Sequence, residues 1–322
     1  MKILAPTSVA LDESKLGLTP DDQLISYDPT ELLPSEHYDA DVLIAWANTN
    51  EQLKDAAQNL RQVKLVQALL AGPDQVRAAG FREEAIIASG SGLHSLTVAE
   101  HALALTLNFI RFLPALAKAQ EENRWASELG GAQELHPEGK VTTLLGAKVL
   151  IWGFGSIGKE TARLFDAFGA QVTGVARSAG ERDGFPVVTE EQMGEVLPET
   201  DVLVMILPTS DETKNALNAN VLEQLPAHAY VVNVGRGTTV NESDLIQALN
   251  SGKIAGAALD VASEEPLPAD NPLWEAKNVV ITPHAAGGRP VNSEELISHN
   301  VEALRADLSG GHGEYRNKMT RG

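Results

Sequence analysis

Three polar side chains of this sequence could together reduce a carbonyl group. Arg236, Glu265 and His284 each follow a short apolar run by a few residues. A histidine titrates near neutral pH and can give a proton to an alkoxide, and a carboxylate can orient its imidazole ring. A guanidinium can bind a substrate carboxylate and polarise the carbonyl beside it. These are the protein groups that the reduction of a 2-oxo acid needs.

Each of the three also has an ordinary explanation. An arginine between glycines is usually a loop residue, a Glu-Glu-Pro sequence is usually a solvated turn, and a lone histidine is usually structural. Their shared position favours a catalytic site. Ligands of open parallel sheets lie beyond the carboxyl ends of the strands, and each of the three residues follows a predicted strand.

A glycine-rich turn supplies the reason to expect a dinucleotide beside them. Gly153, Gly155 and Gly158 have the spacing G-x-G-x-x-G between a predicted strand, 149–152, and a helical pattern, 159–168. The first glycine allows the tight turn, the second lets a pyrophosphate approach, and the third lets helix and strand pack closely. The N–H groups at the helix start, with the helix dipole, then face the phosphates. The predicted cofactor contacts here are Gly153, Gly155, Ser156, Ile157 and Gly158.

The next predicted strand indicates which dinucleotide is bound. About 20 residues after the turn, an acidic residue usually binds the adenosine ribose 2′-hydroxyl. This sequence has Ala176, Arg177 and Ser178 there instead. A guanidinium and a hydroxyl suit a 2′-phosphate, so we expect NADP(H) in preference to NAD(H), which stays possible. The alternative is that Arg177 is a solvated residue at a strand end.

Alternation of short apolar runs and helical patterns predicts an α/β protein with two Rossmann-like domains and doubly wound parallel sheets. Expected strands are 3–5, 42–46, 65–69, 85–88, 149–152, 171–176, 202–207, 230–234, 254–260 and 279–282, and expected helices are 51–60, 73–79, 95–119, 159–168, 243–250 and 291–308. Residues 125–144 are predicted to be irregular. The predicted cofactor domain is 97–288. Residues 1–96 and 289–322 then form a discontinuous substrate-binding domain.

Composition narrows the class of protein further. The 322 residues carry a formal net charge of −19, which argues against a nucleic-acid or anionic membrane surface. Without cysteine, the chain has no disulfide, no thiolate nucleophile and no Cys-ligated zinc. We predict no metal site. The chain shows neither a signal peptide nor an apolar run of ~18 residues, so a cytoplasmic protein is expected.

Several segments resemble those of the D-isomer-specific 2-hydroxyacid dehydrogenase family, and the resemblance covers nearly the whole chain. The segments that carry it are VAEHALAL (98–105), GFGSIG (153–158), NVGRGTTVNESDL (233–245), AALDVASEEPLPADNPLW (257–274) and ITPHAAG (281–287). The resemblance implies an active site in the cleft between the two domains. It also implies a homodimer through the cofactor domains, and it assigns the catalytic Arg, Glu and His to Arg236, Glu265 and His284.

The resemblance implies further contacts. Backbone N–H groups of Ala71 and Gly72, in a loop after a first-domain strand, match those that bind the substrate carboxylate, to which Arg236 and His284 also contribute. Asp260 matches the family's aspartate beside the nicotinamide. The cofactor would also contact Leu207, Pro208, Val234 and Gly235.

Departures from the family pattern refine the expectation and leave alternatives. The family often has His at Ile206 and Ala at Gly235. Because it lacks the acidic ribose-binding residue, the sequence resembles the NADP-dependent glyoxylate/hydroxypyruvate reductases. The segment around Trp46 is apolar where phosphoglycerate-using members carry a cation, which favours a small or apolar 2-oxo acid. Trp46 could line the pocket, although an apolar tryptophan is more often part of the core.

Three alternatives remain. One is an NAD-dependent enzyme similar to phosphoglycerate dehydrogenase. Another is formate dehydrogenase, which pairs the active histidine with Gln and is therefore disfavoured by Glu265. The third is a corepressor or scaffold that keeps the fold and only senses the nucleotide.

Overall fold

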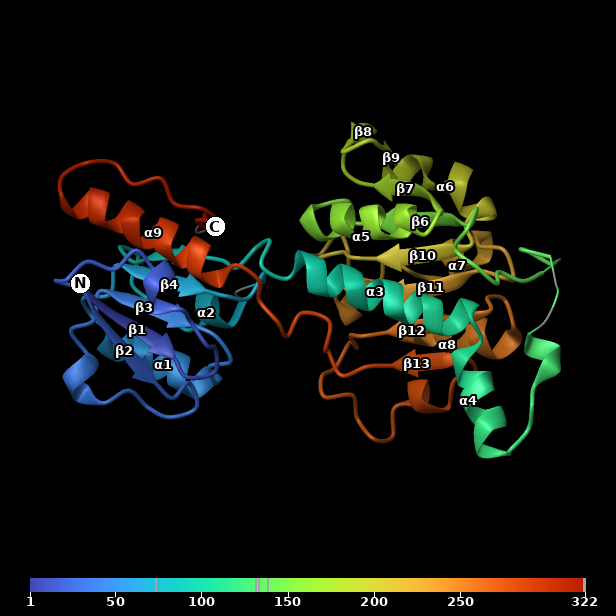
Figure 1. The fold of residues 1–322 in the computed structure, drawn as a ribbon, viewed down its shortest axis with the longest axis horizontal. Coiled ribbons are helices and arrows are strands. Elements are labelled where there is room, and N and C mark those ends of the chain that lie inside the picture. The colour runs from blue at the N-terminus through green and yellow to red at the C-terminus, as the bar shows by residue number, and fades with distance from the viewer. Residues whose placement is uncertain (73, 131, 133, 138, 321–322) are drawn as a thin grey trace. The chain divides into compact units, whose positions relative to one another are not determined.

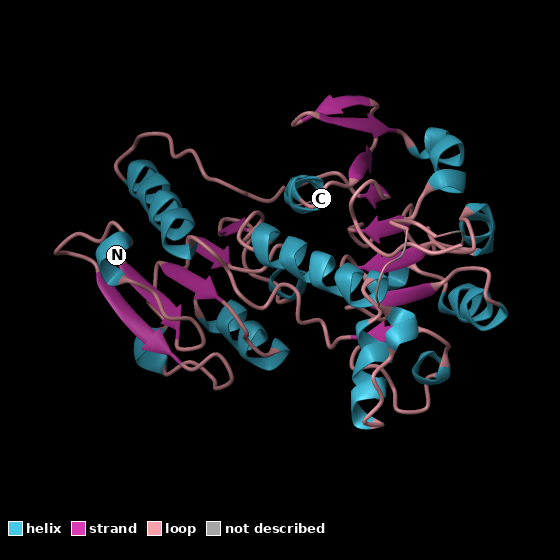
Figure 2. Cartoon of the chain, turned by 45° about the vertical axis from the view of Figure 1, so that its right-hand side comes forward, coloured by secondary structure: helices cyan, strands magenta, loops and turns pink. Residues whose placement is uncertain are grey.

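The computed structural model describes residues 1–72, 74–130, 132, 134–137 and 139–320. It separates into two compact units, unit 1 with Met1–His94 and Arg289–Gly322, and unit 2 with Ser95–Gly288. The first boundary precedes the predicted one by two residues, because Ser95 and Leu96 belong to the first turn of a unit 2 helix. Both units have helices along a mainly parallel sheet, which confirms the predicted fold class (Figures 1 and 2).

Unit 1 contains a five-stranded parallel sheet in the order β2-β1-β3-β4-β5. Its elements are β1 (Lys2–Pro6), β2 (Gln23–Tyr27), β3 (Val42–Ala45), α1 (Asn50–Asn59), β4 (Leu65–Ala68), α2 (Asp74–Ala78), β5 (Ile86–Ala88) and α9 (Ser293–Leu308). This strand order is that of flavodoxin-like sheets. The helix predicted over 73–79 corresponds to α2, and its first residue, Pro73, lies outside the described residues.

The C-terminal part of the chain completes unit 1. Helix α9 packs Leu296, Ile297, Val301 and Leu304 into the core on one face of the sheet. Asn300, buried on α9, donates to the Gln67 side chain of β4 at 2.5 Å. The segment after Leu308 follows the last predicted helix, and the sequence predicted no secondary structure for it. It returns to the sheet and pairs with β5, where Met319 N–H donates to the Ile87 carbonyl at 2.9 Å.

Unit 2 contains an eight-stranded sheet in the order β13-β12-β11-β10-β6-β7-β9-β8, parallel except for β8. Its elements are α3 (Ser95–Ile110), α4 (Leu113–Glu121), β6 (Lys148–Trp152), α5 (Ser156–Ala167), β7 (Gln171–Val175), β8 (Gly180–Arg182), β9 (Phe185–Val188), α6 (Met193–Val196), β10 (Val202–Met205), α7 (Ala219–Gln224), β11 (Tyr230–Asn233), α8 (Glu242–Ser251), β12 (Gly256–Leu259) and β13 (Val279–Ile281). The strand order reverses between β6 and β10. This reversal is the position at which doubly wound sheets bind ligands.

Alternate side chains of the unit 2 strands fill two separate cores. On β6, Val149 and Ile151 join the core formed with α3 and α5, whereas Leu150 and Trp152 join the core formed with α6, α7 and α8. Strands that are buried on both faces read as continuous apolar runs. This is why strands such as β6, β10 and β11 could be predicted from the sequence.

The long helix predicted over 95–119 is wrong, since the chain breaks between α3 and α4. The two helices are bent by 60°, and Phe112 between them has a φ of 55°. Pro114 lies in the first turn of α4, where its missing N–H is tolerated. Inside one continuous helix the same proline would remove a hydrogen bond and clash with the preceding turn.

Two regions of strand were missed in the sequence. One is β2 in unit 1, and the other is the antiparallel hairpin of β8 and β9. The hairpin turns through Asp183 and Gly184, both with positive φ, which is a two-residue turn of the type I′ kind. Strand β9 pairs with β7 and so takes the third strand position of the nucleotide-binding unit.

Among the described residues, no single helix is both long and apolar enough to cross a membrane. The bent α3–α4 pair meets that test by length and composition alone, as buried helices of other proteins do.

Candidate active site

The glycine-rich turn connects β6 to α5 in unit 2. Gly153 has a φ of 109°, and a Cβ there would lie 2.6 Å from the Ile206 carbonyl oxygen. A Cβ on Gly158 would lie 2.4 Å from the Gly153 carbonyl oxygen, so both glycines are required by packing. At Gly155, by contrast, a Cβ would meet open space. Gly155 is also the N-cap of α5, and no side chain caps the helix. The turn therefore has room, and N–H donors, for a phosphate group.

The three proposed catalytic residues follow adjacent strands. Asn233 of β11 is in register with Leu259 of β12, which is in register with Ile281 of β13. Arg236, Glu265 and His284 come after these positions. They therefore lie beyond the carboxyl edge of one sheet, as predicted, in the same unit as the glycine-rich turn.

The segment around Arg236 is fixed by its own polar neighbours. Asn233 is fully buried, donates to the Arg236 carbonyl at 3.1 Å and accepts from the Gly235 N–H at 3.0 Å. The Arg236 side chain donates through Nη1 to the Gly235 carbonyl at 2.8 Å. Within the described part of the chain, its guanidinium forms no ion pair with a carboxylate. An acidic substrate could therefore supply the missing counter-charge.

His284 and Glu265 form a pair. The imidazole Nδ1 lies 2.7 Å from a Glu265 carboxylate oxygen, and the other oxygen accepts from the Ala262 N–H at 3.1 Å. Because Nδ1 is engaged, Nε2 is the ring atom that can exchange a proton with a substrate. The His284 side chain is 46% exposed in this structure, which leaves that atom accessible.

Asp260 fixes the backbone that carries His284. Its side chain is 1% exposed and accepts from the N–H groups of Ala285 and Ala286 at 2.9 and 3.0 Å. It also accepts from the Thr282 hydroxyl at 2.5 Å and lies 3.2 Å from the His101 ring. The His284 N–H donates to the Asp260 carbonyl at 2.7 Å. These contacts hold His284 at a φ of 52°, which costs a non-glycine residue energy.

Gly237 packs the Arg236 segment directly against the segment that leads to Glu265. A Cβ on Gly237 would lie 1.9 Å from the Ala262 carbonyl carbon and 2.0 Å from its oxygen. Only a residue without a side chain allows this approach of two backbones. Similarly, a Cβ on Gly235 would lie 2.7 Å from the Leu207 carbonyl oxygen, which accounts for glycine where the family often has alanine.

Replacing Gly237 with alanine should therefore separate two segments of the site. We expect a loss of about 1–3 kcal/mol in stability, measured by urea unfolding, together with a fall in kcat/KM. Gly130→Ala is the matched control, because a Cβ there would meet nothing within 4 Å. If the Gly237 variant matched the Gly130 variant in both measurements, this packing argument would be wrong.

The predicted 2′-phosphate residues lie at the end of β7. Arg177 and Ser178 are both exposed. The Ser210 hydroxyl holds the pKa of the nearby Glu212 carboxylate below its usual value, and the charge of Arg177 adds to this effect. Glu212 also lines a pocket of about 580 Å³. The first lining residue, Thr209, comes directly after Leu207 and Pro208 in the sequence. Leu207 and Val234 are buried where their strands end.

The predicted substrate contacts of unit 1 follow its own strands. Ala71 is exposed and Gly72 is partly exposed in the loop after β4. Trp46, after β3, stacks on His94 with ring centroids 5.3 Å apart. His94 donates a hydrogen bond from Nε2 to the Leu69 carbonyl at 2.8 Å, and burial lowers the pKa of His94 below its usual value.

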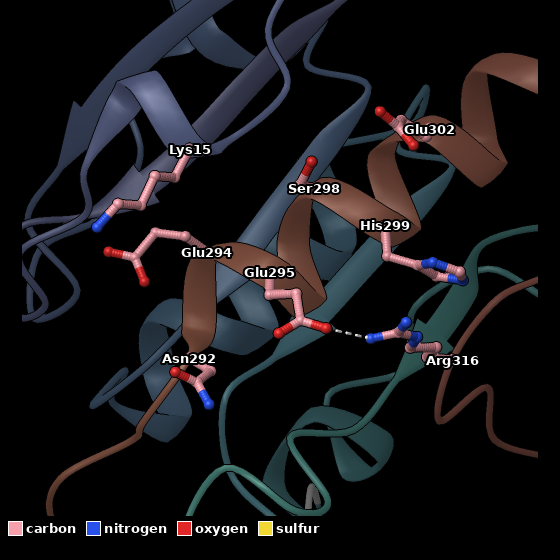
Figure 3. A pocket seen from close by; sticks show the side chains of 8 residues that line it. All are labelled: Lys15, Asn292, Glu294, Glu295, Ser298, His299, Glu302 and Arg316. Carbon is pink, nitrogen blue, oxygen red and sulfur yellow. Dashed lines mark hydrogen bonds and ion pairs between the residues drawn. The ribbon is translucent and has the colours of Figure 1, made fainter.

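Another pocket lies in unit 1, and none of the predicted site residues lines it. It has a volume of about 610 Å³ and lies along α9 (Figure 3). Two of its lining side chains, Glu295 and Arg316, form an ion pair at 2.8 Å. Among the described residues, no group of three or more His, Asp or Glu side chains is placed to hold a metal ion.

Arg182 and the Asp260 network were missed in the sequence. Arg182 lies on β8 and donates to the Ser178 hydroxyl at 2.7 Å. The Asp183-Gly184 dipeptide after it, a strong hairpin signal, could have revealed this strand. His101 and Thr282 lie 181 residues apart in the sequence, so no local pattern could show that both contact Asp260.

Comparison with known proteins identifies the family of this chain. The family described as D-isomer specific 2-hydroxyacid dehydrogenase, NAD binding domain, matches residues 103–286. Over 281 residues the chain is 32% identical to glyoxylate/hydroxypyruvate reductase A of Escherichia fergusonii, a span that covers 84% of each protein.

Two solved structures are similar over nearly the whole chain. A D-isomer specific 2-hydroxyacid dehydrogenase family protein from Aeromonas salmonicida has a TM-score of 0.79 at 28% identity, over 99% of this chain and 98% of that one. A D-isomer specific 2-hydroxyacid dehydrogenase from Xanthobacter autotrophicus, in complex with NADPH and MES, has a TM-score of 0.72 at 27% identity, over 99% of this chain and 97% of that one.

The matched family region contains the glycine-rich turn and all three residues proposed for catalysis. The resemblance inferred from the sequence is confirmed, and so is the expectation of an enzyme. The chain belongs to the D-isomer-specific 2-hydroxyacid dehydrogenase family of NAD(P)-dependent oxidoreductases.

Proposed function

We propose that this protein is an NADPH-dependent reductase of small 2-oxo acids, with glyoxylate and hydroxypyruvate as the first candidates. The observation that carries the proposal is the His284–Glu265 pair at 2.7 Å, beyond the same sheet edge as Arg236. The name of the Escherichia fergusonii relative, glyoxylate/hydroxypyruvate reductase A, supports this substrate class.

The glycine-rich turn fits a dinucleotide. Gly155 leaves open space where a side chain would stand, and the uncapped start of α5 presents N–H groups there. We assign the pyrophosphate to this turn and the nicotinamide side to Leu207, Pro208, Val234, Gly235 and Asp260. When bound, the cofactor supplies the hydride that the carbonyl carbon accepts.

The residues of the chain supply binding, orientation and a proton. Arg236 binds the carboxylate of the 2-oxo acid and polarises the neighbouring carbonyl. His284 donates a proton from Nε2 to the carbonyl oxygen as negative charge develops on it. Glu265 accepts from Nδ1, fixes the orientation of the ring and stabilises its cationic form. Asp260 holds the backbone on which His284 is carried.

The first-domain residues favour a small or apolar substrate. The apolar Trp46 stacks on a His94 whose pKa is lowered by burial, so this pair is neutral at neutral pH. A neutral pair provides no counter-charge for a phosphorylated substrate. Two further parts of the proposal come from the family resemblance. The first is that the N–H groups of Ala71 and Gly72 bind the substrate carboxylate. The second is a homodimer through unit 2, and light scattering can test whether the protein is a dimer.

Arg177→Ala should lower kcat/KM for NADPH by about tenfold or more and leave kcat/KM for NADH nearly unchanged. The reason is that a charge-assisted contact to phosphate is worth about 1.5–3 kcal/mol, and NADH has no 2′-phosphate. The measurement is steady-state kinetics with both cofactors.

Arg163→Ala is the matched control for that variant, because Arg163 is an exposed arginine on α5. Equal losses with the two cofactors, or no loss with NADPH, would show that Arg177 does not select the cofactor.

A substrate panel tests the proposal as a whole. Glyoxylate, hydroxypyruvate, pyruvate, a branched 2-oxo acid and a phosphorylated one are each offered with NADPH and with NADH, and cofactor oxidation is followed optically. Turnover of the phosphorylated acid with NADH would indicate the phosphoglycerate dehydrogenase alternative. Cofactor binding without turnover of any acid would indicate the sensor or corepressor alternative.

A further inference from the structure

Arg182 brings a second guanidinium to the adenosine end of the cofactor site. Its Nη2 donates to the Ser178 carbonyl at 3.1 Å and to the Ser178 hydroxyl oxygen at 2.7 Å. Its Nη1 lies 3.4 Å from the carbonyl oxygen of Phe154, inside the glycine-rich turn. Arg182 thus connects the turn after β6 with the end of β7, the two segments that hold a dinucleotide.

The acceptors around Arg182 leave its charge unbalanced. All three are neutral oxygens, and among the residues that the structure describes no carboxylate pairs with this guanidinium. The adjacent Asp183 is already paired with Lys159 of α5 at 3.0 Å. An arginine held in this way can still attract an anion.

Glu212 adds negative charge near the end of β7. The charge of Arg177 contributes least to the lowered pKa of this exposed carboxylate, and its hydrogen bond to Ser210 contributes most. In a chain of net charge −19, a second cation near Arg177 strengthens the attraction for a phosphate dianion.

The hairpin holds Arg182 in place before any ligand arrives. Strand β9 pairs with β7, and β8 pairs with β9 through Arg182 itself, opposite Phe185. The ion pair of Lys159 and Asp183 attaches the hairpin turn to α5. Because Ser178 Oγ accepts from Arg182, its own hydroxyl hydrogen is free to be donated elsewhere. Such preorganisation lowers the entropic cost of binding.

We infer that Arg182 is a specificity-determining residue that binds the 2′-phosphate of NADP(H) together with Arg177 and Ser178. This inference rests on the proposed function, since it concerns the cofactor that the reductase uses. It adds a residue from outside the strand-end position where such contacts are expected, carried there by the β8–β9 hairpin.

Binding of 2′,5′-ADP and 5′-AMP, measured by calorimetry, isolates the phosphate contact, because the two ligands differ only in the 2′-phosphate. Arg182→Gln should weaken the binding of 2′,5′-ADP by about tenfold and change the binding of 5′-AMP by less than about twofold. Arg182→Lys keeps the charge but not the planar fork, so its affinity for 2′,5′-ADP should lie between those of the wild type and the glutamine variant. Arg163→Gln serves as the surface control.

The outcomes are distinguishable. If the wild type binds 2′,5′-ADP no more tightly than 5′-AMP, the NADP preference itself is wrong, and the role of Arg182 falls with it. If the wild type discriminates and Arg182→Gln does not change the discrimination, only the role of Arg182 is overturned. Equal weakening of both ligands would mean that Arg182 merely supports the Phe154 turn, and this too would overturn the inference.

Discussion

Replacing His284 with alanine should lower kcat by a factor of about 10² to 10⁴, the usual contribution of a positioned general acid. The Nδ1 atom of His284 is engaged by Glu265 at 2.7 Å, so the loss concerns proton donation from Nε2. NADPH binding, measured by calorimetry, should change little. Glu265→Gln should lower kcat less, because an amide oxygen can still accept from Nδ1 but does not stabilise the cationic ring.

His299→Ala provides the matched histidine control. His299 lies on α9 in unit 1, and its ring contacts the Glu314 carbonyl. We expect near-normal turnover from this variant. If His284→Ala also turned over at a near-normal rate, the proton donor would have to be another group, and the assignment of the catalytic site would fail.

Arg236→Ala should have an effect of similar size on kcat/KM, a fall of about 10² to 10³, with a raised KM and a lowered kcat. A single guanidinium binds the substrate carboxylate in the ground state and polarises the carbonyl in the transition state, so both constants change. Arg236→Lys should recover part of kcat through its charge, although it cannot reproduce the planar fork.

The separate effects on KM and on kcat are the informative measurement for Arg236→Ala. A raised KM with an unchanged kcat would mean that Arg236 only binds substrate and does not polarise the carbonyl. Arg163→Ala again serves as the control for loss of a surface arginine. An unchanged kcat/KM in Arg236→Ala would remove Arg236 from the site.

The strands that build the site could be predicted from the sequence because they are buried on both faces. Strands β6, β10 and β11 are continuous apolar runs whose alternate side chains enter two different cores. The glycine-rich turn could be recognised because its steric demands are local. A Cβ on Gly158 would lie 2.4 Å from the Gly153 carbonyl oxygen, so only glycine fits at this position.

The α3–α4 break and the β8–β9 hairpin had local signals that the apolar periodicity concealed. The periodicity of 95–119 continues through Pro114, whereas the backbone bends by 60° before it. The hairpin strands are short and half exposed, so their pattern of apolar residues is weak. In both cases the residues that restrict the backbone, a proline and an Asp-Gly pair, were more informative than hydrophobicity.

The polar contacts that support His284 could not be predicted from any local stretch of sequence. His284 follows a strand, as expected, but its positive φ is imposed by Asp260, which lies 24 residues earlier in sequence and 1% exposed in the structure. His101 approaches the same carboxylate from α3. Such long-range polar contacts depend on the packing of several elements, and no sequence window contains them all.

We propose that this chain uses NADPH to reduce a small 2-oxo acid to a D-2-hydroxy acid, with His284 as the proton donor. The most direct measurement incubates the wild type and His284→Ala with NADPH and hydroxypyruvate, or with glyoxylate or pyruvate, and compares NADPH consumed with hydroxy acid formed. Chiral chromatography identifies the enantiomer where the product is chiral. We predict one hydroxy acid per NADPH for the wild type, in the D form, and almost none for the variant. No hydroxy acid from any of the three acids, or equal yields from both proteins, would contradict the claim.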